Sequence, residues 1–254
     1  MFKHPLQFIW LRSTANLKAD AQNSYLGIIW WILEPLLLTS LIYLAFSSGL
    51  RGQGGKEFAY FLLCGMLPFK WTASCLTAGG NALILNKGII GQSYYPKWIF
   101  PSIAVVTMSL RYCVALTLLL IFLLIGDYPP QWTWLGIVYI LACQLLLNFG
   151  TSYLLSALIP VVPDLSNLIP IITMGLMFTS GIFFDISTRP DEIQAILRLN
   201  PFVEIVESYR EVLLKGNAID FSNTLYAWLF GLCCLVIGAI LLKKYDRHYP
   251  RLLP

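Results

Sequence analysis

Charged residues are scarce in this sequence of 254 residues. Asp, Glu, Lys and Arg together make up 12% of the chain, hydrophobic residues make up 57%, and the mean hydropathy is +0.70. A soluble globule needs more polar surface than this composition supplies. The apolar residues lie in long runs, each about as long as a membrane-spanning helix. The sequence therefore predicts an all-α membrane protein.

Catalytic and metal-binding motifs are also absent. The chain has no G-x-S-x-G or H-E-x-x-H sequence, and its two histidines, His4 and His248, lie near opposite ends. The six cysteines fall inside apolar runs without a C-x-x-C or Cys/His spacing, as small buried hydrophobes do. We therefore expect no catalytic residue, no metal site and no cofactor bound by this chain.

One stretch imitates a nucleotide-binding loop but lacks its essential residues. In GLRGQGGKE, residues 49–57, Leu50 stands where the first glycine belongs, and Glu57 stands where Ser or Thr would hold magnesium. The chain thus has no visible means of hydrolysing ATP. Its net charge of +4 is divided among several loops and forms no basic stripe, so nucleic acid is not an expected partner.

Six apolar runs have the roughly 20-residue length that crosses a membrane. They cover residues 26–46, 58–78, 101–125, 133–159, 168–184 and 225–242. Only the turn PVVPDLSN separates the fourth run from the fifth, and its prolines do not mark a domain boundary. We expect a single transmembrane domain over residues 1–254, with its N-terminal segment retained because no cleavable signal pattern is visible.

Basic residues are distributed unevenly between the two sides of the predicted membrane. The N-terminal segment, the loop after the second run, the turn after the fourth and the C-terminal tail together hold nine Lys and Arg residues, and the opposite side holds six. This difference follows the positive-inside rule weakly. We therefore expect both termini in the cytoplasm.

Two cytoplasmic segments have an amphipathic pattern. In residues 1–25, Phe2, Leu6, Ile9 and Leu17 lie close to one helical face, which predicts a helix in the membrane interface. Its simpler role is to anchor the first span. Residues 81–100 are too apolar for a free loop, and either lie against lipid headgroups or dock onto a cytoplasmic partner.

The connection between the fifth and sixth runs, residues 185–216, is too regular for a linker. Thr188, Pro190 and Asp191 are typical of a helix start, and Asn200-Pro201 interrupts that helix. A second helix follows and ends at Gly216. Its apolar face holds Phe202, Ile205, Val206, Tyr209 and Leu213, and its charged face holds Glu204, Glu207, Glu211 and Lys215. These helices are either a solvated hairpin that caps the bundle or a lid over the outer mouth of a pathway.

Four stretches carry a resemblance to a known family. They are LGIIWWILEP at 26–35, GMLPF at 65–69, LILNKGIIGQSYYPKWIFP at 83–101 and LNPFVEIVESYREVLLKG at 199–216. In this order the sequence resembles the permease subunit of type 2 ATP-binding-cassette exporters of polysaccharides such as O-antigen, capsule and teichoic acid. The resemblance implies a homodimer of six-span subunits in the bacterial inner membrane, around a channel for a lipid-linked glycan. It also implies two copies of a separate cytoplasmic ATPase, which bind ATP and magnesium.

The same resemblance implies roles for individual residues. A coupling helix in the cytoplasmic loop, which receives movement from the ATPase, would contain Asn86, Lys87, Tyr95, Pro96 and Lys97. Two outer re-entrant gate helices would contain Asn200, Pro201, Tyr209, Arg210 and Gly216. Trp30 and Pro35 match the family's W-x-x-x-x-P pattern, whereas Lys70 departs from the small or aromatic residue expected there.

Three charged residues lie inside the predicted spans, where an isolated charge is costly. Because Glu34, Lys70 and Arg111 share a depth from the cytoplasmic face, we expect Glu34 to pair with Lys70 or Arg111. An internal ion pair and direct contact with a ligand both remain open.

Aromatic side chains of the first and fifth spans are candidates for lining a channel, because sugar rings stack on aromatic faces. The candidates are Trp30, Trp31, Tyr43, Phe46, Phe178, Phe183 and Phe184. The simpler alternative is that they anchor the helices at the membrane interface.

Two other functions remain open. A secondary transporter or channel that works without an ATPase would be favoured by inverted repeats, and we find no convincing repeat. A membrane-embedded glycan-modifying enzyme would need an acid–base pair or a histidine near a cavity, whereas the outer acids follow one helix face. The sequence therefore favours the exporter permease.

Overall fold

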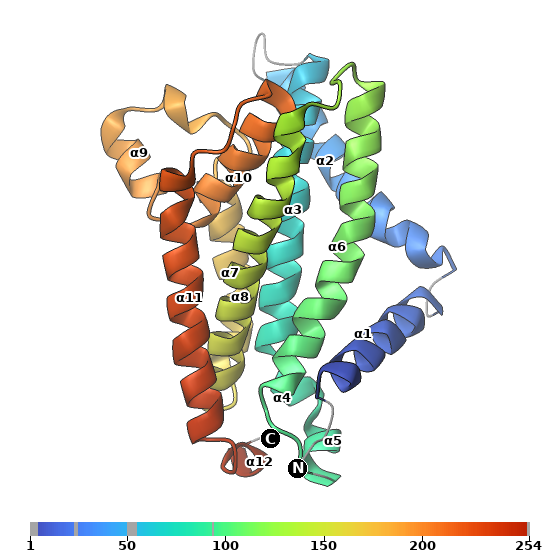
Figure 1. Ribbon diagram of the computed structural model, residues 1–254, viewed down its shortest axis with the longest axis vertical. Helices are drawn as coiled ribbons and strands as arrows, with labels where there is room; N and C mark the ends of the chain where they lie inside the picture. Colours follow the sequence, from blue (N-terminus) through green and yellow to red (C-terminus); the bar gives the residue numbers. More distant parts are fainter. Residues whose placement is uncertain (1–4, 23–24, 50–54, 93, 253–254) are drawn as a thin grey trace.

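The computed structural model describes residues 5–22, 25–49, 55–92 and 94–252, without the side chains of residues 46–49 and 251–252. In these residues the regular structure is helical, as the sequence predicts, with long helices side by side and short ones at both ends (Figure 1). The long helices are α1 (Pro5–Gln22), α2 (Trp30–Gly49), α3 (Lys56–Gly80), α6 (Ile99–Ile125), α7 (Gly136–Leu158), α8 (Asp164–Thr179) and α11 (Phe221–Lys244). The short ones are η1 (Gly27–Ile29), α4 (Ala82–Leu85), α5 (Lys87–Gln92), η2 (Trp132–Leu135), η3 (Ile186–Thr188), α9 (Asp191–Leu197), α10 (Phe202–Arg210), the π-helical turn η4 (Glu211–Lys215) and α12 (Tyr249–Leu252).

Five helical segments are long and apolar enough to cross a membrane. They are Gly27–Ala45, Lys56–Gly80, Ile99–Ile125, Trp132–Leu158 and Phe221–Lys244, and they correspond to five of the six expected runs. The remaining run forms α8, whose 16 residues extend about 24 Å at roughly 1.5 Å per residue, short of a core of roughly 30 Å. The expected helix to residue 184 is cut short because the chain turns after Thr179, at Gly181 with φ +68°.

Helix α3 forms the centre of the bundle. Its middle section from Leu62 to Phe69 is almost wholly buried, and it packs against α2, α6, α7, α8 and α10. The buried cluster joins α3 to Leu119 of α6, Leu147 of α7 and Tyr209 of α10. The main core therefore spans elements that are far apart in the sequence.

Helices α7 and α11 approach each other through glycines. A Cβ atom at Gly150 would lie 2.2 Å from the Gly231 carbonyl oxygen, and one at Gly238 would lie 2.6 Å from the Leu154 nitrogen. Small residues at such positions allow close packing in membranes, where the hydrophobic effect does not hold helices together. This contact fixes α11 against the core.

Helix α1 lies obliquely outside the bundle, against α6 (Figure 1). Ile9 packs on Ile99 and Ile103, and the buried Ser13 hydroxyl donates to the Ile103 carbonyl, 3.2 Å away. The predicted helix is therefore present, but its expected apolar face is only partly used, because Leu6 is 77% exposed. Phe2 lies outside the described residues.

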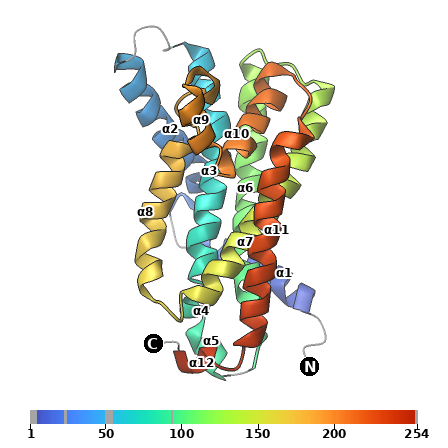
Figure 2. The same ribbon diagram turned by 90° about the vertical axis from the view of Figure 1, so that its left-hand side faces the viewer.

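The short helices divide between the two ends of the bundle. Figures 1 and 2 show α9 and α10 towards one end, with α4, α5 and α12 at the other. The connection between α8 and α11 thus lies opposite the loop between α3 and α6. This arrangement separates the two groups of predicted site residues by most of the length of the bundle.

Candidate functional site

A charged recess lies among α1, α2, α3 and α6. Its volume is about 340 Å³, and acidic, basic and aromatic side chains form its walls. The charged residues are Asp20, Glu34, Lys70 and Arg111, and the aromatic residues are Trp30, Trp31, Trp71 and Tyr112. The structure therefore brings all three predicted intramembrane charges to one hollow.

Two ion pairs cross this recess. Lys70 Nζ lies 2.6 Å from Glu34 Oε1, so the expected pairing of Glu34 is confirmed with Lys70. Arg111 pairs with Asp20 instead of Glu34, and its guanidinium lies 5.2 Å from the Trp31 ring centroid. Sequence reasoning missed Asp20 because it lies on the N-terminal helix, outside the predicted spans. The two pairs connect α2 to α3 and α1 to α6.

The recess has a donor that these pairs leave unused. Arg111 Nε is buried and has no acceptor within the described part of the chain. Lys70 has three protons and uses one on Glu34, and Ser74 adds a hydroxyl to the wall. Aromatic faces beside free donors form a surface that suits polyhydroxylated or anionic groups.

We predict that Glu34 and Lys70 stabilise the fold as a pair. Glu34→Gln or Lys70→Met alone leaves a charge without its partner and should lower the unfolding free energy by about 1 kcal/mol, because both side chains are partly exposed. The double variant should lose about 1 kcal/mol less than the sum, measured by thermal unfolding in detergent. Glu34→Gln combined with Arg111→Met is the matched control and should be additive, since these residues are not paired. Additive losses for Glu34 and Lys70 would contradict the pairing.

The predicted channel-lining aromatics separate into groups. Trp30 and Trp31 face the charged recess, whereas Phe183 and Phe184 line a second hollow of about 350 Å³ beside Phe58 and Asp185. Tyr43 packs on Phe58, with ring centroids 6.3 Å apart, and Phe178 packs on Phe183 at 5.3 Å. The side chain of Phe46 lies outside the described residues. The six candidates whose side chains are described therefore do not form one continuous wall within this chain.

The apolar face predicted for the helix after Asn200-Pro201 is confirmed. Phe202, Ile205, Val206, Tyr209 and Leu213 are all at most 2% exposed. The opposite face is less solvated than expected, because Glu204 is only 6% exposed. Its carboxylate accepts from Arg198, which also lies 3.5 Å from Glu207. Glu204, which the spacing places on the charged face, is therefore buried in an ion pair with Arg198 and does not face water.

The residues that begin and end this helix are positioned by local hydrogen bonds. Asn200 Oδ1 accepts from the Phe202 amide at 2.9 Å, and its Nδ2 donates to Ser180 Oγ at 2.9 Å, next to the end of α8. Pro201 precedes the first helical residue. Gly216 has φ +70°, a left-handed conformation that favours glycine, and a Cβ there would lie 2.0 Å from Gln131 Oε1, so the exposed Gln131 side chain would have to move to accept one.

Arg210 is buried although it carries a charge. It is 5% exposed, and its guanidinium donates to the carbonyls of Gly181 at 2.8 Å, Ile182 at 2.9 Å and Phe61 at 3.3 Å. Its Cζ lies 3.4 Å from the Phe61 ring centroid. No carboxylate lies within 4.0 Å of it in the described part of the chain. Arg210 therefore joins α10 to the start of α3 and to the turn after α8.

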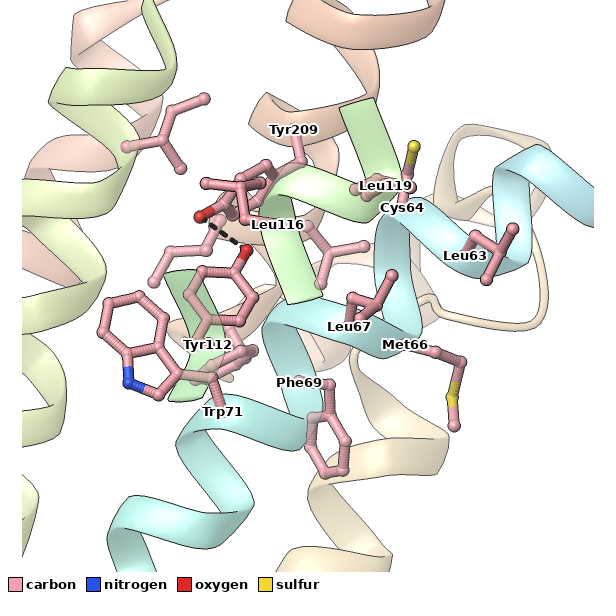
Figure 3. Packing of buried hydrophobic residues seen from close by; sticks show 14 of the residues in the cluster. Leu63, Cys64, Met66, Leu67, Phe69, Trp71, Tyr112, Leu116, Leu119 and Tyr209 are labelled. Carbon is pink, nitrogen blue, oxygen red and sulfur yellow. Dashed lines mark hydrogen bonds between the residues drawn. The ribbon is translucent and has the colours of Figure 1, made fainter. Parts of the chain in front are cut away.

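Tyr209 belongs to a buried polar network at the centre of the bundle. The Tyr112 hydroxyl donates to the Tyr209 hydroxyl at 3.2 Å, and Tyr209 donates to Gln144 Oε1 at 3.1 Å (Figure 3 shows the tyrosine pair). Gln144 Nε2 donates to Thr72 at 3.1 Å, and Thr72 donates to Asn148 at 2.6 Å. The signal that sequence reasoning passed over is the pair of amides four residues apart in an otherwise apolar span.

The predicted coupling residues occupy a compact segment after α3. Asn86 lies between α4 and α5 and donates to the Ala82 carbonyl at 2.8 Å, and Lys87 is exposed at the start of α5. Tyr95 stacks on Phe8 of α1, with centroids 5.6 Å apart. Lys97 is only 2% exposed, and burial lowers its pKa against the opposing effect of Asp246. Lys97 is therefore a buried structural residue of this segment and is not exposed for contact with a partner.

The tail after α11 holds this segment in place. Asp246 Oδ1 accepts from the Lys97 amide at 3.0 Å, and Asp246 Oδ2 accepts from the Tyr94 hydroxyl. Tyr249 is fully buried and donates to the Ala157 carbonyl of α7 at 3.1 Å. Sequence reasoning missed Asp246 and Tyr249, whose partners lie about 90 to 150 positions away.

Comparison with known proteins identifies the family. The ABC-2 type transporter family matches residues 7–214. The chain is 24% identical over 239 residues to the O-antigen export system permease protein RfbA of Klebsiella pneumoniae, covering 94% of this chain and 92% of that protein. It is 26% identical to the RfbA protein of Myxococcus xanthus, over 81% and 79% of the two chains, and 27% identical to the polysialic acid transport protein KpsM of Escherichia coli, over 87% and 86%. Because the family match covers most of the chain, this protein belongs to the ABC-2 type transporter family.

Proposed function

We propose that this chain is the membrane-spanning permease subunit of an ATP-driven exporter, which moves a lipid-linked polysaccharide across the bacterial inner membrane. The observation that carries the proposal is similarity, over 81% to 94% of this chain, to relatives named for O-antigen export and polysialic acid transport. The chain offers a polar, aromatic recess inside a bundle of spanning helices. ATP and magnesium belong to a separate partner ATPase.

The proposed assembly is a homodimer with two ATPase subunits. Helices α2 and α8 flank α3 on the side away from α11 (Figure 2). They bury little of their apolar surface within one subunit: α8 buries only Ile169 among its residues, and Leu41 and Leu44 of α2 are over 60% exposed. These faces supply surface for a second copy and for lipid. In this assembly α8 and the residues up to Phe184 act as the sixth membrane crossing of each subunit.

The proposed mechanism transmits movement from one end of the bundle to the other. Both termini and the segment from α4 to Lys97 face the cytoplasm, where exposed residues of α5 contact the ATPase. Asn86, Lys87, Tyr95, Pro96 and Lys97 form or support this coupling element. The outer helices α9 and α10 open the opposite end of the bundle. Asn200, Pro201, Tyr209, Arg210 and Gly216 position these gate helices. The glycan passes along α2 and α8 of the two subunits.

Purification from native cells tests this proposal. The detergent-solubilised protein should bring with it a nucleotide-binding protein in equal amount, and the eluate should hydrolyse ATP. Lys87→Glu together with Gln92→Glu, on the exposed face of α5, should reduce the recovered ATPase by at least about tenfold, because reversing one charge and adding another at a docking surface removes its electrostatic complementarity to the partner. The control, Lys215→Glu at the outer end, should leave recovery unchanged. A protein that purifies alone, without ATPase activity, would favour a secondary transporter or channel.

A further inference from the structure

A basic hollow lies at the cytoplasmic end of α11. Its volume is about 690 Å³, and its walls come from the segment before α6, from α7, and from the end of α11 with the tail that follows. The apolar part includes Tyr153, Ala239 and Leu242, and Tyr94 and Trp98 also line the hollow. Tyrosine and tryptophan at the ends of spanning helices are typical of the membrane–water boundary.

The rim of this hollow is electropositive. Lys243, Lys244 and Arg247 are exposed there. The single carboxylate in the wall, Asp246, already accepts from the Lys97 amide and the Tyr94 hydroxyl. The three basic side chains outnumber the single carboxylate, so the rim carries an excess of positive charge. The N–H groups of these side chains suit the oxygens of a phosphate.

An exposed apolar stripe of α11 leads directly to these cations. Leu229, Leu232, Val236 and Ile240 follow at helical spacing and are 56%, 49%, 48% and 57% exposed. Lys243 and Lys244 come next at the same spacing. Because α11 is a membrane-spanning segment by length and composition, this stripe faces acyl chains and the lysines stand at headgroup level.

We propose that this hollow binds the phosphate headgroup of an anionic phospholipid of the inner leaflet, with an acyl chain along the exposed stripe of α11. Basic pockets between spanning helices on the cytoplasmic side bind such headgroups. A protein partner fits the site less well, because the hollow is recessed and floored by residues of α7 and α11, whereas α5 is the exposed helix beside it. This proposal does not depend on the exported substrate.

The position of the hollow gives the lipid a regulatory consequence. Asp246 lies in its wall and at the same time holds Tyr94 and Lys97, which precede α6. A bound phosphate would attract the basic tail around Asp246 and so keep the tail against the loop that carries α5. An anionic lipid should therefore stabilise the cytoplasmic end of the protein.

Binding can be measured on the full chain in nanodiscs. Native mass spectrometry should find phosphatidylglycerol retained in preference to phosphatidylcholine, and short-chain phosphatidylglycerol should raise the melting temperature. Lys243→Gln with Arg247→Gln should weaken this affinity about thirtyfold, since each cation near a phosphate contributes about 1 kcal/mol. The matched control, Arg12→Gln with Lys18→Gln on the exposed side of α1, removes the same charge and should have no effect. Lys243→Arg, which keeps the charge, should retain binding and shows that the site tolerates substitution.

Three results would overturn the proposal. The first is an equal loss of affinity for phosphatidylglycerol in the control and test variants, which indicates a general attraction of anionic lipid to basic surface. The second is equal stabilisation of the wild type by inorganic phosphate, which indicates a soluble anion. The third is loss of a copurifying ATPase from the Lys243 and Arg247 variant with lipid retention unchanged, which indicates a protein-docking surface.

Discussion

Arg210→Met should unfold this protein more readily than almost any other single substitution of a charged residue. The side chain of methionine cannot donate to the carbonyls of Gly181 and Ile182, which would remain buried without partners, whereas the Phe61 carbonyl keeps its bond within helix α3. Each such group costs about 1–3 kcal/mol, so we expect a loss of about 3 kcal/mol or more in unfolding free energy. Thermal unfolding of the purified protein, with its amount in the membrane, measures this loss.

Two variants separate the role of Arg210 from loss of charge in general. Arg210→Lys keeps the charge but loses the planar set of donors, so its stability should fall between wild type and Arg210→Met. Arg189 also lies over an aromatic ring, at 4.6 Å from the Phe184 centroid, but it is exposed. Arg189→Met should therefore change stability by less than about 0.5 kcal/mol. Equal effects at positions 189 and 210 would show that the carbonyl contacts contribute little.

Gly150→Ala should separate α7 from α11. The added Cβ would lie 2.2 Å from the Gly231 carbonyl oxygen and 3.0 Å from the Leu235 nitrogen, both of which are backbone atoms that cannot rotate away. Overpacking of this kind costs about 1–3 kcal/mol, which exceeds the gain of up to about 1 kcal/mol from replacing glycine in a helix. Thermal unfolding should show a lower melting temperature.

Gly175→Ala is the matched control for the contact between α7 and α11. Gly175 lies in the exposed part of α8, and nothing lies within 4 Å of a Cβ built there. The same substitution should leave stability unchanged or slightly raise it. If both alanine variants melted at the same temperature, the close approach at Gly150 would not be important for stability.

Local sequence patterns predicted elements and apolar faces well. The length of the apolar runs located the five segments that are long enough to span a membrane. Periodicity located the helix at 202–210 and the burial of its apolar face, because such a face depends on neighbours three or four positions away. The shared depth of Glu34, Lys70 and Arg111 reduced the expected partners of Glu34 to two, of which the structure shows Lys70. Lys70, which departs from the residue expected by resemblance, is therefore matched by an acid on the adjacent helix.

Contacts between distant segments were beyond this kind of reasoning. Periodicity shows that Glu204 lies on a polar face. It does not show that the turn at Asn200-Pro201 brings the Arg198 side chain into contact with the Glu204 carboxylate. Tyr209 and Gln144 are 65 positions apart, and Lys97 and Asp246 are 149 apart. Each partner is a single polar residue, and the hydrophobic pattern of the segment around it gives no sign that this residue has a distant partner. Prediction of such pairs requires the packing of whole helices.

The hydrogen bonds of Tyr209 restrict how the end of the bundle that carries α10 can rearrange. If α10 moved outward alone, Gln144 Oε1 and the Tyr112 hydroxyl would lose their hydrogen-bond partner inside an apolar interior. Motion of α10 that preserves these bonds must carry α6 and α7 with it as one rigid body. Such collective motion belongs to the microsecond-to-millisecond range of domain movements, not to the nanosecond range of loops. Relaxation of this helix should therefore be slow and synchronous with its neighbours.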